Sequence, residues 1–186
     1  CHETMFNCLE YGEKHKIPIS FDLNYREQLW KTMEPKSVID KMLRYSSVFK
    51  TGYDEAELIW EKGYEAVEYA KYFQSVNGRL VVVTKGAGGA LAFDGTNLVE
   101  QPGYDIEVVD PIGAGDAFTA GFLAGILKHS ELKEFYTLDV PTRKKILLDA
   151  LRIGNVCGAL TCTRRGDTAA MPTMQEVEQF RKRYGR

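Results

Sequence analysis

Residues 110–116, which read DPIGAGD, bring together the residue types that a group-transfer site needs. The apolar run at 117–127 follows them and is typical of a helix buried inside a protein. The small residues at 113–115 would then lie at the amino end of that helix, where backbone N–H groups lack intrahelical partners and the helix dipole attracts anions. Asp116 would lie in the first turn, where a carboxylate can act as a base. The spacing therefore predicts a site for phosphoryl transfer.

A purely structural explanation is also open, because Gly-x-Gly before a helix serves tight packing and Asp116 would complement the helix dipole. The longer stretch 110–123 is more specific. It resembles the carboxy-terminal signature of the ribokinase-like (PfkB) carbohydrate kinases, whose usual form is Asp-Thr-x-Gly-Ala-Gly-Asp. The resemblance implies that Asp116 is the catalytic base and that Gly113, Ala114 and Gly115 form the anion hole.

The order of the predicted elements favours an α/β fold. Extended runs are expected at 17–23, 47–50, 80–84 and 106–109, a hairpin at 90–99, and helices at 2–15, 37–45, 64–75, 117–127 and 146–160. Residues 128–145 are expected to form an irregular surface excursion, and residues 173–176 read as a capping box that opens a last helix. Strands that alternate with helices indicate a three-layer α/β/α sandwich with a mainly parallel sheet.

Composition narrows the class of protein. The chain has 186 residues, 44% of them apolar, which is enough for one sizeable core, in a single domain or part of one. A net charge of −2 gives no electrostatic case for nucleic acid or an anionic membrane, and no apolar run approaches the roughly 20 residues of a membrane span. The four cysteines lack metal-binding spacing. We expect a cytoplasmic protein that acts on a small molecule.

The amino end begins with Cys1 and a predicted helix that no strand precedes. The resemblance to the ribokinase-like kinases extends over nearly the whole chain, yet members of that family carry a long segment before this point. The resemblance therefore implies that residues 1–186 are the carboxy-terminal part of a single kinase domain. The first strands and the small β lid would then lie outside this sequence.

Polar residues follow the first predicted strand. Ligands meet the carboxyl ends of parallel strands, so Asp22, Asn24 and Arg26 are candidates for binding a substrate. Alternatively, Asp22 and Asn24 bond to the backbone of the turn and Arg26 pairs with Glu27. Residues 22–30 are similar to a segment of 2-keto-3-deoxygluconate kinases and, with more variation, of fructokinases. The resemblance implies that Arg26 binds the carboxylate of a sugar acid, which its planar fork fits better than Lys would.

Two further strand ends carry candidates for the nucleotide and its metal. After the strand at 47–50, the family usually shows Asn-x-x-Glu near Mg²⁺ and phosphate. Here Gly52 replaces the Asn and Glu55 is the matching carboxylate; alternatively, Glu55 only complements a helix dipole. The turn after the strand at 80–84 is no Walker loop. It resembles the family's Thr-x-Gly-x-x-Gly turn, and Thr84 and Gly86 would approach the phosphates of ATP.

The helix at 146–160 and the loop behind it carry the remaining candidates. Asn155 lies near where the family places the adenine, although a lone Asn is as readily a helix-packing group. Family members with a loop like 161–172 can hold a monovalent cation, such as K⁺, together with the first Asp of the signature, here Asp110. Asp167 of that loop is predicted to contact the substrate. Ala170 replaces a Ser hydroxyl that some members supply, which leaves the cation site open.

The sequence therefore predicts an ATP-dependent, Mg²⁺-requiring sugar kinase. The preferred substrate is 2-keto-3-deoxygluconate, with fructose as the alternative within the class. A hypothesis of another class is a catalytically silent scaffold that binds nucleotide or a partner chain. The sequence does not decide whether the protein forms a homo-oligomer.

Overall fold

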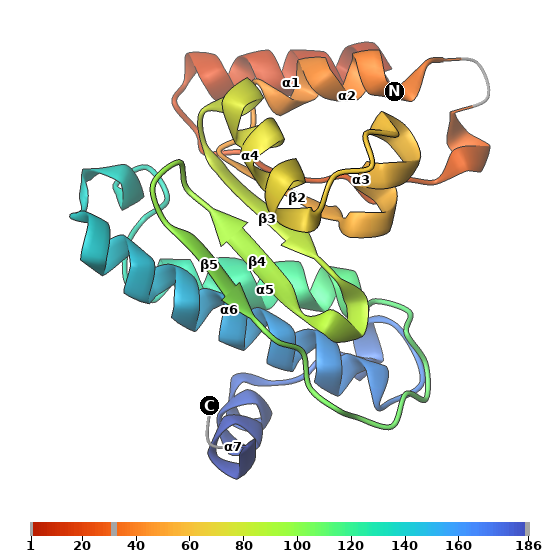
Figure 1. Ribbon diagram of the computed structural model, residues 1–186, viewed down its shortest axis with the longest axis vertical. Helices are drawn as coiled ribbons and strands as arrows, with labels where there is room; N and C mark the ends of the chain where they lie inside the picture. Colours follow the sequence, from red (N-terminus) through yellow and green to blue (C-terminus); the bar gives the residue numbers. More distant parts are fainter. Residues whose placement is uncertain (1, 31–32, 185–186) are drawn as a thin grey trace. The chain divides into compact units, whose positions relative to one another are not determined.

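The structure is a computed structural model that describes residues 2–30 and 33–184. Its backbone, coloured along the sequence in Figure 1, divides into two compact units. The first unit comprises residues 1–85 with 91–98, and the second comprises residues 86–90 with 99–186. The five strands are hydrogen-bonded in the order β1-β2-β3-β4-β5.

Parallel strands and the helices between them build the first unit. Its elements are α1 (His2–Lys14), β1 (Ser20–Asp22), α2 (Pro35–Leu43), β2 (Val48–Gly52), α3 (Tyr53–Trp60), α4 (Ala66–Asn77), β3 (Leu80–Thr84) and most of β4 (Ala90–Phe93), whereas β5 (Leu98–Gln101) belongs mostly to the second unit. Strands β1 and β2 pair in parallel, with Asp22 opposite Lys50, and β2 pairs in parallel with β3. Parallel pairing through helical connections is the arrangement that the alternating sequence predicted.

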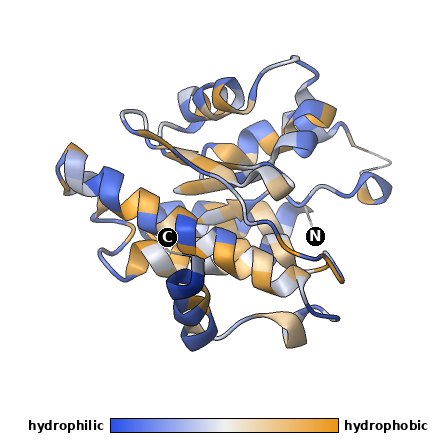
Figure 2. Ribbon diagram, turned by 60° about the horizontal axis from the view of Figure 1, so that its bottom comes forward, coloured by the Kyte–Doolittle hydropathy of each residue, from blue (hydrophilic) through white to orange (hydrophobic). Residues whose placement is uncertain are grey.

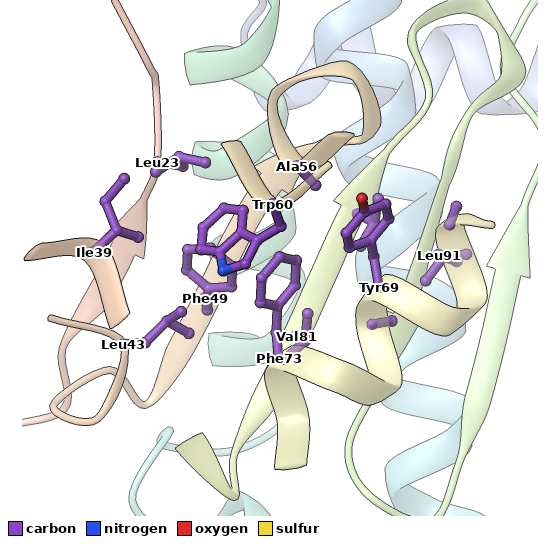
Figure 3. Packing of buried hydrophobic residues seen from close by; sticks show 13 residues of the cluster. Leu23, Ile39, Leu43, Phe49, Ala56, Trp60, Tyr69, Phe73, Val81 and Leu91 are labelled. Carbon is purple, nitrogen blue, oxygen red and sulfur yellow. The ribbon is translucent and has the colours of Figure 1, made fainter. Parts of the chain in front are cut away.

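An aromatic and aliphatic core joins three of these helices to the strands. Figure 3 shows Phe49 of β2, Trp60 of α3 and Phe73 of α4 gathered around one centre, with ring centroids of Phe49 and Trp60 lying 5.0 and 4.7 Å from that of Phe73. Both pairs meet edge to face, as aromatic rings prefer. Helices α2, α3 and α4 therefore bury the same strand surface, and the ends of β1, β2 and β3 are held rigidly.

Three helices dominate the second unit: α5 (Ala114–Leu127), α6 (Val140–Cys162) and α7 (Met174–Tyr184). Helices α5 and α6 lie side by side along most of their length (Figure 1). A Cβ on Gly121 would come closer than 3.0 Å to Cys157, and one on Gly125 would collide with Ala150. These glycines permit a close helix–helix approach, which explains why the apolar run at 117–127 is so rich in small residues.

Helix α7 packs on α6 through a narrow apolar strip and is otherwise hydrophilic, as its mostly blue ribbon in Figure 2 shows. Val177 and Phe180 supply the strip. The predicted capping box is confirmed, because Glu176 Oε2 accepts from the amide of Thr173 at 2.8 Å and Thr173 Oγ1 accepts from the amide of Glu176 at 3.4 Å.

Two predicted elements were wrong. No strand forms at 106–109; the amide of Val109 donates instead to the carbonyl of Cys162, and the side chains of Val108 and Val109 stay more than half exposed. Residues 128–145 are not irregular throughout, because α6 begins at Val140. Asp139 caps it by accepting from the amide of Thr142 at 2.9 Å, with proline in the first turn, a start signal that was present in the sequence.

Candidate active site

The glycine turn before α5 has the geometry that the sequence predicted. Gly113 is the N-cap residue, with φ of 78°, and its carbonyl accepts the first helical hydrogen bond, from Ala117, at 2.9 Å. A left-handed φ is readily adopted only by glycine. The amide of Ala114 is used within the turn, where it donates to the carbonyl of Pro111 at 3.3 Å.

The next two amides, of Gly115 and Asp116, are open. They precede the first residue that can donate within an α-helix, and within 2–30 and 33–184 no oxygen accepts from them. Both residues are exposed, and so is the carboxylate of Asp116. Donors of this kind at a helix amino end suit the oxygens of a phosphate group, so the anion-binding chemistry fits the residues present.

Other helices of the chain place a carboxylate on a backbone amide at their amino ends, either in the first turn or at the N-cap residue. Glu34 and Asp139 cap α2 and α6, while Glu55, Glu68 and Glu176 reach back from the first turns of α3, α4 and α7. Among the helices whose amino ends the structure describes, α5 is the one that no side chain caps. This exception coincides with the predicted catalytic turn.

Asp110 links the turn to the loop that follows α6. Its Oδ1 accepts from the amide of Ile112 at 3.1 Å, and its Oδ2 accepts from the amide of Gly166 at 3.3 Å. The carbonyl of Cys162 accepts in turn from the amides of Val109 and Asp110, at 2.8 and 3.1 Å. Burial and the charge of Asp110 raise the pKa of the Cys162 thiol. The structure therefore brings the predicted cation loop and the catalytic signature together.

Asp167 lies against the glycine turn. A Cβ on Gly113 would come closer than 3.0 Å to Asp167 Oδ1, so this carboxylate lies directly beside the glycine. The side chain is exposed. Its contact with Gly113 is one that the sequence could not indicate, because 54 positions separate the two residues. Asp110, Gly113–Asp116 and Asp167 thus form one cluster in the second unit.

The predicted phosphate turn leaves β3 in a tight bend. Gly86 has a φ of 53° and Gly89 a φ of 92°, and the amide of Gly89 donates to the carbonyl of Gly86 at 3.1 Å. Thr84 Oγ1 donates to the carbonyl of Thr51 at 3.4 Å. Gly86 itself is exposed, as contact with a ligand requires.

Asn155 is buried on α6, and its amide group donates to the carbonyls of Gln101 and Pro102, each at 3.1 Å. The two amide hydrogens of an asparagine are thereby used. This arrangement favours the alternative that Asn155 serves packing, and it leaves the predicted contact with the adenine to the side-chain oxygen.

The substrate candidates of the first unit differ in whether their side chains are already paired within the chain. Asp22 forms an ion pair with the buried Lys50, whose Nζ donates to Oδ1 at 3.0 Å. Asn24 is exposed in a left-handed turn with φ of 40°. Arg26 is also exposed, and its Nη1 donates to the carbonyl of Tyr25 at 2.9 Å. The pairing of Asp22 with Lys50 follows from the register of β1 and β2 and was missed.

Glu55 is held by the backbone. Its Oε1 accepts from the amide of Tyr25 and its Oε2 from the amide of Gly52, both at 2.7 Å. It therefore ties the loop after β1 to the start of α3, as well as being the predicted metal ligand. In the two described ranges, no three His, Cys, Asp or Glu side chains converge in a way that could hold a metal ion. Among the helices described, none has the length and apolar character needed to cross a membrane.

Residues 1–174 match the family model described as pfkB family carbohydrate kinase. The chain belongs to the pfkB carbohydrate kinase family. It is 28% identical over 187 residues to a 5-dehydro-2-deoxygluconokinase from Clostridium tetani (strain Massachusetts / E88), covering 97% of this chain and 50% of that protein. It is 31% identical over 166 residues to a fructokinase from Vibrio alginolyticus, covering 87% of this chain and 50% of that protein. The chain spans about half the length of these relatives.

A solved structure agrees with the family assignment. The chain is similar to a double-mutant fructokinase from Vibrio cholerae O395 in its fructose-, ADP- and potassium-bound form, with a TM-score of 0.81 and 26% identity. The similarity covers 96% of this chain and 55% of that chain. The ribokinase-like α/β fold predicted from the sequence is confirmed.

Proposed function

We propose that the protein containing this pfkB-family chain transfers the γ-phosphoryl group of ATP to a primary hydroxyl of a small sugar acid of the keto-deoxygluconate class. The observation that carries the proposal is the open amino end of α5. There, the exposed Asp116 lies in the same turn as two amides that donate to no oxygen within residues 2–30 and 33–184. A base and an anion-binding pair in one turn are what phosphoryl transfer requires.

In this proposal, Asp116 accepts the proton of the sugar hydroxyl as the oxygen attacks. The amides of Gly115 and Asp116 donate to the phosphoryl oxygens on which charge develops, and they need no reorganisation because the helix fixes them. ATP supplies the phosphoryl group, and Mg²⁺ neutralises phosphate charge when bound. Gly113, in its left-handed conformation, sets the direction in which the helix begins.

The Gly86 turn is proposed to contact the nucleotide phosphates. The positive φ of the exposed Gly86 brings backbone rather than a side chain to the surface, which lets phosphate oxygens approach closely. Thr84, at the end of β3, would add its hydroxyl. Asn155 is assigned no contact with the nucleotide here, because its amide hydrogens are used on the carbonyls of Gln101 and Pro102.

For the cations, we propose Glu55 in the environment of Mg²⁺ and Asp110 beside a monovalent cation. Each carboxylate already accepts hydrogen bonds from two backbone amides, and its remaining lone pairs are available for a further contact. Support for a monovalent cation comes from the Vibrio cholerae fructokinase, whose structure contains potassium. The loop that Asp110 holds through Gly166 is the one predicted to supply carbonyl ligands.

A sugar acid is preferred over fructose because Arg26 is exposed and uses Nη1 on its own chain, which leaves other guanidinium donors for a carboxylate. Asp22 is committed to Lys50, whereas Asn24 is exposed and suited to a sugar hydroxyl. One relative is named a kinase of 5-dehydro-2-deoxygluconate, an acid whose keto and deoxy positions differ from those of 2-keto-3-deoxygluconate. Fructokinase is the second candidate, supported by the relative from Vibrio alginolyticus.

A substrate panel tests the proposal. In the full-length protein, ADP production is measured with 2-keto-3-deoxygluconate, 5-dehydro-2-deoxygluconate, fructose and ribose, for the wild type and for Arg26→Lys. We expect an acid to be the best substrate and its KM to rise in the variant more than kcat falls, because the charge stays while the fork is lost. Preference for fructose, with a silent Arg26→Lys change, would favour fructokinase. Turnover of none of the four would contradict the proposal.

A further inference from the structure

Asn155 connects α6 to a stretch of backbone that contains no functional candidate. Its amide donates to two successive carbonyls, those of Gln101 and Pro102, where the chain leaves β5. Arg152, one turn earlier on α6, adds a contact from Nε to the side-chain oxygen of Gln101 at 3.4 Å. The side chain of Asn155 is buried and both its hydrogens are used, so it holds residues 101 and 102 at a fixed distance from α6.

The same backbone presses directly against the Gly86 turn. A Cβ on Gly103 would come closer than 3.0 Å to the carbonyl oxygen of Ala87, and a Cβ on Gly89 would do so against the carbonyl oxygen of Gln101. Both obstacles are backbone atoms, which cannot swing aside as a side chain can. The turn and residues 101–103 therefore fit together only backbone to backbone, and a shift of either moves the other.

We propose that Asn155 is a positioning residue, which sets the Gly86–Gly89 turn for nucleotide phosphates through the carbonyls of Gln101 and Pro102. The inference rests on the proposed function, in which that turn contacts the phosphates. Asn155 acts through two layers of backbone: both its amide hydrogens are used on carbonyls, and we assign its side-chain oxygen no contact with the nucleotide base. Its contribution is therefore the same for every purine nucleotide.

The kinetic test replaces Asn155 with Leu in the full-length protein and measures initial rates with ATP and with GTP. We expect KM to rise by the same factor for both nucleotides, about tenfold, while kcat changes less, because a displaced turn weakens phosphate binding without touching the base. The matched control is Asp149→Asn, which weakens the ion pair between the same helix α6 and Arg181 of α7 but has no link to the turn. A loss that differs between ATP and GTP would show that Asn155 reads the base, and would overturn the proposal.

A second readout does not depend on catalysis. Amide hydrogen exchange at residues 86–89 is expected to accelerate in Asn155→Leu and in Gly103→Ala, which pushes on Ala87 from the other side, and to stay unchanged in Asp149→Asn. Exchange at the wild-type rate in folded Asn155→Leu contradicts the proposal; should that variant not fold, Asn155→Asp, which keeps the side chain's shape but loses both amide hydrogens, gives the same decision. If the wild type phosphorylates no sugar, the proposed function fails while the exchange result still decides the positioning role.

Discussion

The amino ends of α3 and α5 have nearly the same residue types, but a first-turn side chain bonds to the backbone of α3 and none does so in α5. Each begins at a glycine, Gly52 or Gly113, and carries an acidic residue three positions later, Glu55 or Asp116. Glu55 folds back onto the amide of Gly52, whose φ is −75°, and closes the end of α3. Gly113 has φ of 78°, and no side chain caps α5.

The difference has a physical cause in side-chain length and backbone conformation. A glutamate three positions into a helix can reach the amide of the N-cap residue, as Glu55, Glu68 and Glu176 do. Aspartate is one methylene shorter, and the left-handed glycine turns its own backbone away. The contrast shows that an acidic residue in a first turn is partly used by the backbone where it folds back, as Glu55 is, and keeps its whole carboxylate for chemistry where it cannot.

Asp116→Glu gives the largest expected effect on this contrast. The longer side chain keeps the carboxylate but displaces it and gives it the reach that Glu55 has, so the open end of α5 is expected to close. We expect kcat to fall by about 10²-fold, the scale of a misplacement of roughly 1 Å. The measurement is steady-state ADP production with the best sugar of the panel. Unchanged kcat would mean that the position of the carboxylate does not matter.

Glu55→Gln tests the closed end. The neutral side chain no longer accepts charge-assisted hydrogen bonds from the backbone amides of Tyr25 and Gly52. The free energy of unfolding is therefore expected to fall by about 1–3 kcal/mol. Urea denaturation measures the change, and Asp54→Asn, in the same first turn of α3, is the control for loss of charge alone. A loss no greater than that of the control would show that the two backbone contacts stabilise nothing.

The smallest expected effect is that of Glu176→Gln on the free energy of unfolding, and it depends on pH. The amide of Thr173, the side chain of Arg164 and the hydroxyl of Thr173 lower the pKa of Glu176 from 4.5 to about 2. A lowered carboxyl pKa contributes stability that is present above the unfolded pKa and is lost as the pH falls through the folded value. The stability difference between wild type and variant should therefore be full at pH 7 and shrink between pH 4.5 and 2, as urea denaturation at several pH values can measure. A difference that does not change with pH would contradict this.

The elements that are set by interactions between residues close in sequence were predicted from the sequence. The apolar run at 80–84 became β3 with unchanged bounds, and the start of α5 followed from three small residues before an apolar run. The capping box at 173–176 was also found, because its hydrogen bonds lie within four residues. The error at 106–109 arose because two neighbouring valines suggested an extended run, whereas the backbone there bonds to the end of α6.

Contacts across the sequence account for the rest. The pairing of Asp22 with Lys50 depends on strand register, and the contact of Asp167 with Gly113 depends on where a loop returns. For Asn155 the sequence offered the adenine or packing as alternatives, and the two carbonyls that it binds lie more than 50 positions away. None of these partners can be recognised from local spacing, so the sequence predicted the candidate residues but not the residues that they contact.

The most direct test of the central claim compares Asp116→Asn with Asp54→Asn in the full-length protein. Both changes remove one negative charge from the first turn of a helix, but only Asp116 is the proposed base. We expect Asp116→Asn to lower kcat by about 10²- to 10⁴-fold with nucleotide affinity within a few-fold of wild type, and Asp54→Asn to leave both unchanged. Near-normal turnover of the Asp116→Asn variant would contradict the assignment of Asp116 as the catalytic base.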